Sequence, residues 1–522
     1  MASVEKFDTA VIGGGIAGLY AAYLLQEKKD KKVVLLEAKD RIGGRMDSAV
    51  LKCAGGTDTW DVGGQWVGRT QYNLIEVLKE FGLEMYDQYS SGIKKLMIHD
   101  PTNIRSYSGL IPTLGPLELL EIHYMMNMVS KMCKKIDLDN ITTDPNAMEL
   151  DSMTLHSFVT EKCSNEATRE IFEVAIRMVF GVDLSQISML YFLYYCKQGG
   201  GFETLLDIKN GAQEYRVKGS AYQLCEKIAG RLRHVVLGDP VQSIKQTELD
   251  GVTVITRQGK TYHCDNVIAA IPPHLVNHID FSPQLPYDRI KLGEEMPVGH
   301  LIKFIVTYKT AFWKEKGMSG ETTVTGAPGS IGPISCTFDG TSFNGNPAIV
   351  GFICADHAIY WTRKTMVERR EAILQSLATM LGEECLDPIE YIDKDWAKES
   401  YNGGCPVGVM RPRGLMYFHH ALRQPFGRVH WAGTETARLW CGYIEGGIES
   451  AIRAVSEITE QKPSSVHEWR ESRVFSNDSK YISTFQSKSS YLWRFVTFMM
   501  PITAVCVLGW YVYKHMDEAY FW

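Results

Sequence analysis

Two side chains in this sequence, Cys405 and Lys303, have neighbours that favour a functional role over simple packing in the core. Cys405 follows two glycines in the segment Ser400–Pro406, and a thiol so placed could tether a cofactor covalently rather than only line its pocket. A free cysteine is more commonly a small buried hydrophobe, which is how we interpret the other eleven of the twelve cysteines. Lys303 lies within the apolar run HLIKFIV. Because an ammonium group is costly to bury without a partner, we expect a functional role; the alternative is an edge-strand lysine that faces solvent.

The N-terminal region has the pattern of a dinucleotide-binding βαβ unit. The apolar run Thr9–Ile12 predicts a strand, and the glycine-rich stretch Gly13–Gly18 and a helical stretch follow it. A second apolar run, Val33–Leu36, ends at Glu37. A glycine triplet alone would be a weak sign, but the complete pattern with its acid indicates dinucleotide binding. The pattern does not separate FAD from NAD.

The glycines and the acid of this unit each have a physical reason. We expect Gly13 to make the turn, Gly15 to let the backbone approach a pyrophosphate, and Gly18 to allow close packing of helix on strand. The N-terminus of the helix would offer free N–H groups and a positive dipole end to the phosphates. Glu37 would accept hydrogen bonds from a ribose and repel a 2′-phosphate, which disfavours NADP.

Two further glycine pairs come with arginines or polar residues, in Arg41–Arg45 (RIGGR) and Asp61–Trp66 (DVGGQW). They suggest a backbone that wraps closely around a large cofactor, with Arg45 near its phosphates. The alternative interpretation is that both are ordinary loop turns.

A second group of such motifs lies near the other end of the chain. Val429–Ala432 predicts a strand, and Gly433 would let the chain pass close to a ligand. Gly446–Val455 predicts a helix whose N-terminus can point at a developing negative charge, such as that of a reduced flavin. Because both ends of the chain must meet to build one site, we expect a second domain inserted between them.

Together these motifs resemble the flavin-containing amine oxidase family, with the monoamine oxidases as the most similar subgroup, and the resemblance runs over most of residues 6–460. It favours FAD as the cofactor. It also implies an α/β fold in which an FAD-binding Rossmann-like domain is interleaved with an α+β substrate domain. The stretches that carry it are Gly13–Gly18 with Glu37, Arg41–Arg45, Gly63–Gly64, Lys197–Glu214, Gly299–Lys314 and Gly427–Gly447.

The resemblance implies three specific roles. Cys405 stands where the subgroup forms a thioether to the flavin 8α-methyl, and Lys303 where the family holds a water against flavin N5. Tyr443 matches one wall of an aromatic cage that orients the amine. The second wall would be a tyrosine directly after the tethering cysteine, but this chain has Pro406 there.

Further positions follow from the same resemblance. The residues expected to line the substrate cavity are Trp66, Leu206, Gln213, Cys336, Phe352 and Tyr443. The residues expected to contact FAD are Gly13, Gly15, Ala17, Gly18, Glu37, Arg41, Gly43, Gly44, Arg45, Gly63, Gly64, Gln65, Val241, Cys405, Gly433, Thr434, Glu435, Tyr443 and Ile444.

The implied reaction is the oxidative deamination of an amine, in which amine, O2 and water give aldehyde, ammonia and H2O2. An apolar pocket favours a neutral arylalkyl or alkyl amine over an α-amino acid, whose carboxylate would require an arginine. Two alternatives stay open. One is a polyamine or L-amino acid oxidase of the same fold, which Pro406 favours; the other is a flavin-bound membrane protein with little turnover.

Composition and length set the outer limits. The chain has 522 residues, so we expect at least two domains, and its net charge of −6 gives no reason to expect a nucleic-acid partner. The scattered cysteines form no zinc-site pattern and suggest a reducing compartment. The expected FAD-binding domain comprises 1–90, 213–290 and 395–460, and the expected substrate domain 91–212 and 291–394.

The C-terminal region predicts a membrane anchor. Residues 495–513 contain no charged side chain and approach the ~20 residues that span a bilayer as a helix. The connector 461–494 has a surplus of Lys and Arg over acids, which favours a body that faces the cytosol. The family resemblance implies the mitochondrial outer membrane as the destination and allows for a homodimer.

Overall fold

The computed structural model describes residues 6–109, 111–247 and 251–459. The predicted connector at 461–494 and the predicted anchor at 495–513 lie outside the described residues. Within those three ranges, none of the helices combines the length and the apolar character that a membrane crossing requires.

The first sheet has eight strands and contains the predicted nucleotide unit. Its parallel part follows the order β10-β2-β1-β13, with β20 also paired to β13, so strands from both ends of the chain pair with the same strand from its middle. The expected strands at Thr9–Ile12, Val33–Leu36 and Val429–Ala432 are confirmed within a few residues. The strands are β1 (Lys6–Ile12), β2 (Val33–Leu36), β10 (Val235–Val236), β11 (Val241–Thr247), β12 (Gly251–Thr256), β13 (Thr261–Ala269), β14 (Asp280–Ser282) and β20 (Val429–Trp431).

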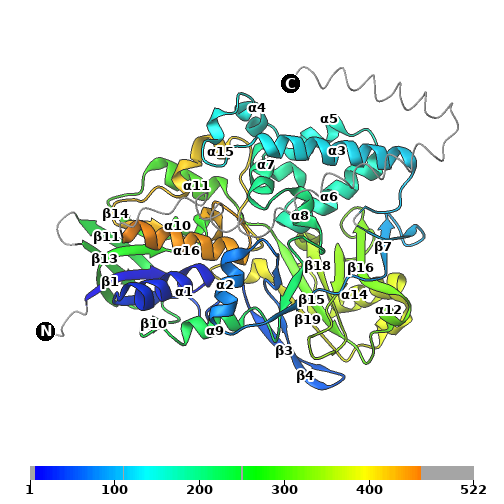
Figure 1. Cartoon of the computed structure of the whole chain (residues 1–522), viewed down its shortest axis with the longest axis horizontal. Coiled ribbons are helices and arrows are strands. Elements are labelled where there is room, and N and C mark those ends of the chain that lie inside the picture. The colour runs from blue at the N-terminus through cyan, green and yellow to red at the C-terminus, as the bar shows by residue number, and fades with distance from the viewer. Residues whose placement is uncertain (1–5, 110, 248–250, 460–522) are drawn as a thin grey trace, which may run out of the picture. The chain divides into compact units, whose positions relative to one another are not determined.

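Two helices from opposite ends of the chain cover this sheet side by side (Figure 1). They are α1 (Ile16–Tyr23), in blue, and α16 (Ile444–Ile458), in orange, and they share one hydrophobic core. A Cβ atom on Gly447 would lie 2.8 Å from Cγ2 of Ile16, so glycine is needed where the two helix N-termini meet. α2 (Tyr72–Glu80) and α9 (Gln223–Ala229) complete this layer.

The second sheet has seven strands in the order β19-β15-β18-β17-β16-β7-β8. Strand β15 is buried along its whole length and has a partner on each side. Lys303 is therefore on an interior strand, which excludes the edge-strand alternative. Helix α14 (Met366–Leu381) packs on this sheet. The strands are β7 (Ile93–Ile98), β8 (Ile104–Tyr107), β15 (Leu301–Thr307), β16 (Met318–Thr325), β17 (Cys336–Asp339), β18 (Ala348–Cys354) and β19 (Glu390–Asp395).

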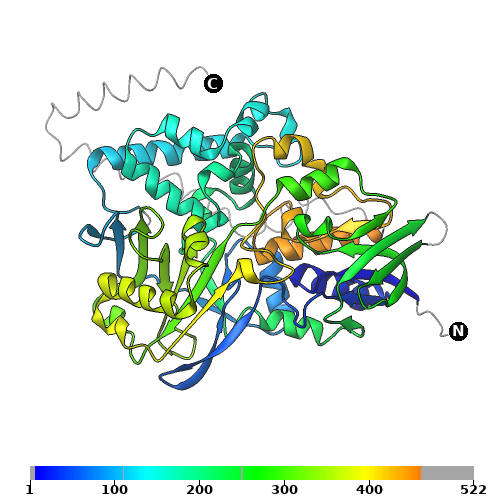
Figure 2. The same ribbon diagram turned by 180° about the vertical axis from the view of Figure 1, so that it is seen from behind.

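A group of helices forms the largest hydrophobic core and appears together at the top of Figures 1 and 2. Within it, every residue of α7 (Met189–Gln198) except Lys197 is buried. Its helices are α3 (Pro116–Lys135), α4 (Ala147–Ser152), α5 (Leu155–Lys162), α6 (Glu166–Phe180), α7 and α8 (Phe202–Leu206).

Two small β units connect the larger parts. The hairpin of β3 (Ser48–Cys53) and β4 (Gly56–Asp61) leads into the loop with Gly63 and Gly64, and β5 (Trp66–Val67) pairs with β9 (Tyr215–Val217). The eleven cysteines among the described residues are all buried and free. The exact domain boundaries stay a prediction.

Candidate active site

One cavity of about 540 Å³ runs from the glycine turn after β1 to an aromatic cluster beside β17 and β18. Its walls come from both sheets, from α7 and from the loop that carries Cys405. Most of the predicted nucleotide residues and all of the predicted substrate residues thus line a single continuous space.

The nucleotide end is built around the N-terminus of α1. Its first residue is preceded by Gly15, and no side chain caps the helix. A Cβ atom on Gly18 would lie 1.9 Å from the Gly13 carbonyl oxygen, so Gly18 is needed for packing, as expected. Gly15 is different, because a Cβ atom there would have no protein atom closer than 3.8 Å. Its lack of a side chain keeps free the space that a ligand would occupy.

Glu37 follows β2 and is only 5% exposed. Its carboxylate accepts hydrogen bonds from the backbone N–H groups of Gly14 and Lys39. These bonds fix the carboxylate at the cavity wall, where it is available to a ribose.

Arg45 and Glu435 form a bidentate ion pair beside the cavity. The guanidinium donates to the two carboxylate oxygens at 2.6 and 2.9 Å, and also to the Pro406 carbonyl at 2.8 Å. Burial would raise the pKa of Glu435, but Arg45 outweighs it and holds that pKa below its usual value. The pair therefore stays ionised and joins motifs from both ends of the chain.

Cys405 is presented by a loop with several left-handed residues. Tyr401, Gly403 and Gly404 have φ values of +59°, +71° and +148°. The Cys405 N–H donates to the Gly299 carbonyl at 2.9 Å, and the side chain lines the cavity. Burial raises the pKa of the Cys405 thiol to about 12, so the thiol is not activated by the charges around it.

Lys303 reaches the centre of the cavity wall from β15. The residue is 3% exposed, and its ammonium group donates to the Gly63 carbonyl at 2.8 Å and to Gln65 Oε1 at 2.6 Å. Burial lowers the pKa of Lys303 to about 7, although Asp61 acts in the opposite direction. A protonated Lys303 has three N–H donors, and these two acceptors use two of them. The third is available to a molecule in the cavity.

The far end of the cavity is aromatic. The Trp66 ring lies 5.0 Å from Phe338 and 5.8 Å from Phe352, measured between centroids. Lys303 Nζ lies 5.7 Å from the Phe352 centroid, so this cluster adjoins the lysine. Gln213 donates to the Leu205 carbonyl at 3.0 Å, and its buried Oε1 has no partner in the described structure.

Tyr443 precedes α16 and faces the same cavity. Its ring centroid is 6.4 Å from that of Tyr195 on α7, with the planes inclined by 40°. Pro406 also lines the cavity, so the expected second cage wall is an aliphatic ring at this position. Tyr195 was not predicted from the sequence, because its aromatic-rich helix has the composition of an ordinary core.

Most of the predicted site residues line the cavity, but three do not. Gly18 packs against the turn, and Glu435 lies behind Arg45. Arg41 points away from the cavity toward Glu399 and Asp47, because those carboxylates compete for its charge. The predicted residues that do line it are Gly13, Gly15, Ala17, Glu37, Gly43, Gly44, Arg45, Gly63, Gly64, Gln65, Trp66, Leu206, Gln213, Val241, Lys303, Cys336, Phe352, Cys405, Gly433, Thr434, Tyr443 and Ile444.

Two carboxylates at the base of the Cys405 loop should contribute to acid stability. Asp395 accepts from His300 at 2.9 Å and from Thr362, and Glu399 accepts from Lys394 and Arg41. Burial opposes ionisation, but these hydrogen bonds outweigh it and lower each pKa to about 2.

Because both folded-state pKa values are depressed, the stabilisation is complete above pH ~4.5 and is lost as the pH falls toward 2. Asp395→Asn should therefore reduce the difference in unfolding free energy between pH 5 and pH 3, measured by urea unfolding. Glu371→Gln, at an exposed position, serves as the control. An unchanged pH dependence in Asp395→Asn would contradict the assignment.

The residues present fit a flavin dinucleotide. The N-termini of α1 and α16 have no side-chain cap and both border the cavity, so they could stabilise a pyrophosphate and an anionic flavin edge. Gln65 Nε2 is buried without a partner among the described residues, beside Lys303. A Cβ atom on Gly15 or on Gly64 would have no protein atom closer than 3.8 Å, which leaves room along the cavity.

Comparison with known proteins agrees with this geometry. The family described as "Flavin containing amine oxidoreductase" matches residues 16–459. "Probable flavin-containing monoamine oxidase A" of Dictyostelium discoideum is 34% identical over 460 residues, which cover 87% of this chain and 98% of the relative. "Amine oxidase [flavin-containing] A" of Canis lupus familiaris is 36% identical over 469 residues, covering 88% and 87%. The solved structure of cyclohexylamine oxidase from Brevibacterium oxydans IH-35A has a TM-score of 0.81 and 30% identity, covering 87% of this chain and 99% of that one.

Proposed function

We propose that this chain, which belongs to the flavin-containing amine oxidoreductase family and is an FAD-dependent amine oxidase, acts on arylalkyl or alkyl monoamines in their neutral form. The overall reaction converts amine, O2 and water into aldehyde, ammonia and H2O2. When bound, the flavin supplies the acceptor for the hydride equivalent that leaves the Cα–H bond of the amine.

The observation that carries this proposal is the charge of the aromatic end of the cavity. Among the described residues that line it, Lys303 is the one charged side chain. The second ammonium group of a polyamine would need a carboxylate there, and the carboxylate of an α-amino acid would need an arginine. The acid Glu37 and the arginines of the cavity belong to the nucleotide end or its border.

The chain's own residues would bind and orient the amine. The neighbouring rings of Tyr443 and Tyr195 line the cavity and would attract an amine nitrogen, while Trp66 and Phe352 would pack on its apolar part. The unpartnered Gln213 Oε1 is available to accept an N–H hydrogen bond. The apolar walls also favour the uncharged amine, whose nitrogen lone pair is needed for oxidation.

A peroxide assay on the purified protein tests the substrate class. We expect turnover with 2-phenylethylamine, tyramine or serotonin, and none that is comparable with spermine or L-amino acids. Peroxide formed only with polyamines or amino acids would refute the proposal. Such a result would point to Pro406, which stands where the second cage tyrosine is expected, as the reason for the different substrate.

Covalent attachment of the flavin through Cys405 is part of this proposal. We expect acid-precipitated wild-type protein to remain yellow, and Cys405→Ala to release all of its flavin into the acid supernatant. The loss is complete because a methyl group cannot form the thioether. Cys354→Ala, at another buried cysteine in the same hydrophobic cluster, is the matched control and should keep its colour. Acid-stable flavin in Cys405→Ala would contradict the assignment.

We also infer a C-terminal anchor at 495–513, with the body facing the cytosol at the mitochondrial outer membrane. The uncharged segment and the basic connector before it support this proposal. Removing 495–522 should release the protein from membranes; membrane association that persists at high salt would refute the anchor. A homodimer stays a prediction, which light scattering of the detergent-solubilised protein can test.

A further inference from the structure

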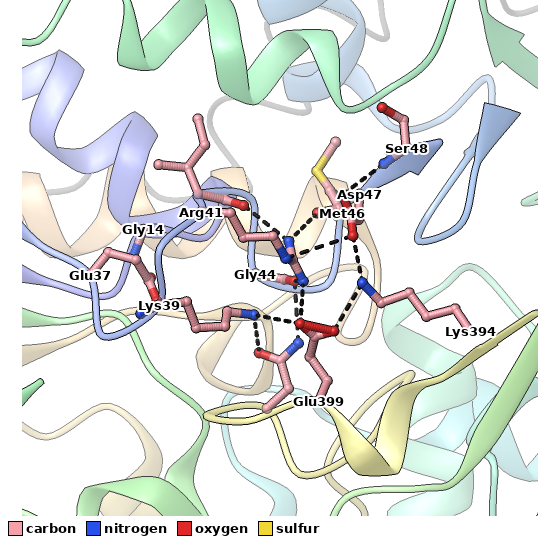
Figure 3. Close-up of polar contacts among 12 residues, drawn as sticks. Gly14, Glu37, Lys39, Arg41, Gly44, Met46, Asp47, Ser48, Lys394 and Glu399 are labelled. Carbon is pink, nitrogen blue, oxygen red and sulfur yellow. Dashed lines mark hydrogen bonds and ion pairs between the residues drawn. The ribbon is translucent and has the colours of Figure 1, made fainter. Parts of the chain in front are cut away.

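Five charged side chains form an ion-pair cluster next to the cavity, which we define as Lys39, Arg41, Asp47, Lys394 and Glu399 (Figure 3). The Lys394 ammonium lies 2.5 Å from Asp47 Oδ2 and 2.9 Å from Glu399 Oε2. Arg41 donates to Glu399 at 3.0 Å, and Lys39 lies 3.7 Å from the same carboxylate. Glu399 is therefore held by three cations at once.

The cluster is partly buried and joins distant parts of the chain. Its side chains are between 7% and 20% exposed, so their mutual attraction is screened less than that of surface pairs. Lys39, Arg41 and Asp47 belong to the segment that follows β2 of the nucleotide unit. Lys394 lies near the end of β19 in the second sheet, and Glu399 begins the loop that leads to Cys405.

The cluster does not have the character of a ligand site. Of its members, only Lys39 lines the main cavity. A second, open cavity borders it, and the described residues that line that cavity include equal numbers of cations and carboxylates. Such a balanced surface has no preference for an anion or a cation. The role of the cluster must come from the segments that it connects.

Those segments are the nucleotide unit and the loop that presents the thiol. Asn402 continues the attachment, because its side chain donates to the Gly44 carbonyl at 3.2 Å and accepts from Lys39 at 3.4 Å. The loop then passes through Gly403 and Gly404 to Cys405, whose N–H is bound to Gly299. The loop is thus fixed at its start by the cluster, at its middle by Gly44 and at its end by Gly299.

We propose that the ion-pair cluster is a positioning device for covalent flavin attachment, which sets the place of Cys405 relative to the nucleotide unit that holds the cofactor. This role rests on the tether proposed above. The surroundings of the Cys405 thiol do not lower its pKa. The position of the thiol must therefore largely explain why the flavin is attached to this cysteine and not to another. Lys394 and Glu399 are positioning residues in this account, since they act through the loop and not on the flavin itself.

The attachment step balances without an additional reagent. The S–H bond of Cys405 and one C–H bond of the flavin 8α-methyl break, and an S–C bond forms. The two electrons and two protons released reduce the flavin, and O2, the oxidant of the established reaction, takes them up to give H2O2.

The test compares the full-length Glu399→Gln and Lys394→Met proteins with wild type while FAD is supplied in excess. We measure total FAD per chain and, separately, the rate at which flavin becomes acid-stable. Since a displacement of ~1 Å can slow a positioned reaction about 100-fold, we expect attachment to slow roughly 10- to 100-fold while total FAD per chain stays near the wild-type value. Lys394→Arg keeps the charge and should restore attachment.

Lys398→Met is the matched control, because Lys398 lies in the same segment but pairs with Asp395 and the Thr362 carbonyl. It should attach flavin at the wild-type rate. An unchanged attachment rate in both cluster variants overturns the proposal, and so does a loss of total FAD per chain that matches the loss of attachment. Thermal melting identifies a variant that has failed to fold. If one of the two cluster variants fails to fold, the attachment rate of the other decides.

Wild-type protein whose flavin is fully released by acid would refute the tether and this role together. Amine-dependent peroxide formation by that same protein would still support the proposed substrate class. The two failures are therefore distinguishable.

Discussion

Arg45→Met is expected to lower the free energy of unfolding by about 3–5 kcal/mol, because it leaves the buried carboxylate of Glu435 without its cation. The Glu435 side chain is 1% exposed. Among the described residues, the Gly408 N–H would still donate to it, at 3.1 Å. The change also removes the donor to the Pro406 carbonyl, so the N-terminal and C-terminal motifs lose a direct connection.

Urea unfolding of the holoprotein measures this effect. The double variant Arg45→Met with Glu435→Gln should recover part of the loss, since it removes the uncompensated charge. Arg41→Met is a matched control with a more exposed partner, Glu399, and should cost less. A loss below about 1 kcal/mol for Arg45→Met, the range of a surface pair, would contradict the role assigned to this ion pair.

Lys303→Met is expected to slow the reaction with O2 by about 100-fold, the usual effect of removing one group that stabilises developing charge in a closed site. Negative charge develops on oxygen as it takes up electrons. Lys303 is the one charged side chain among the described residues at that end of the cavity. Stopped-flow mixing of reduced enzyme with O2 measures this rate, and the reduction by amine should change far less.

The pH dependence gives an independent check of the same prediction. Burial lowers the pKa of Lys303 to about 7, so the charge is present below that pH and is lost as the pH rises through it. The O2 reaction of the wild type should therefore slow above pH ~7, and that of Lys303→Met should lack this step. Equal O2 rates in the two proteins would refute the role of the lysine.

The nucleotide half of the fold could be predicted because its signals are local. The strands β1 and β2 are short apolar runs bounded by glycines and an acid, and each glycine role depends on its near neighbours. The meeting of both chain ends also followed from the motifs, and it is confirmed by the pairing of both β1 and β20 with β13 and by the core that α1 and α16 share.

The features of the site that could not be predicted from the sequence depend on contacts between residues far apart in the chain. Arg41 and Arg45 flank the same glycine pair and look equivalent, yet Arg41 pairs with Glu399 and Arg45 with Glu435. Only the folded chain decides which guanidinium faces the cavity. Tyr195 was missed for the same reason, because nothing in its helical stretch shows that one face of α7 closes the site.

The most direct test of the central claim is to mix the holoprotein with 2-phenylethylamine in the absence of oxygen. We expect the yellow colour of the flavin to bleach at a rate that increases with the concentration of the neutral amine. Return of oxygen should then restore the colour and release one H2O2 per flavin. A flavin that keeps its colour with every monoamine but bleaches with spermine or an L-amino acid would contradict the account.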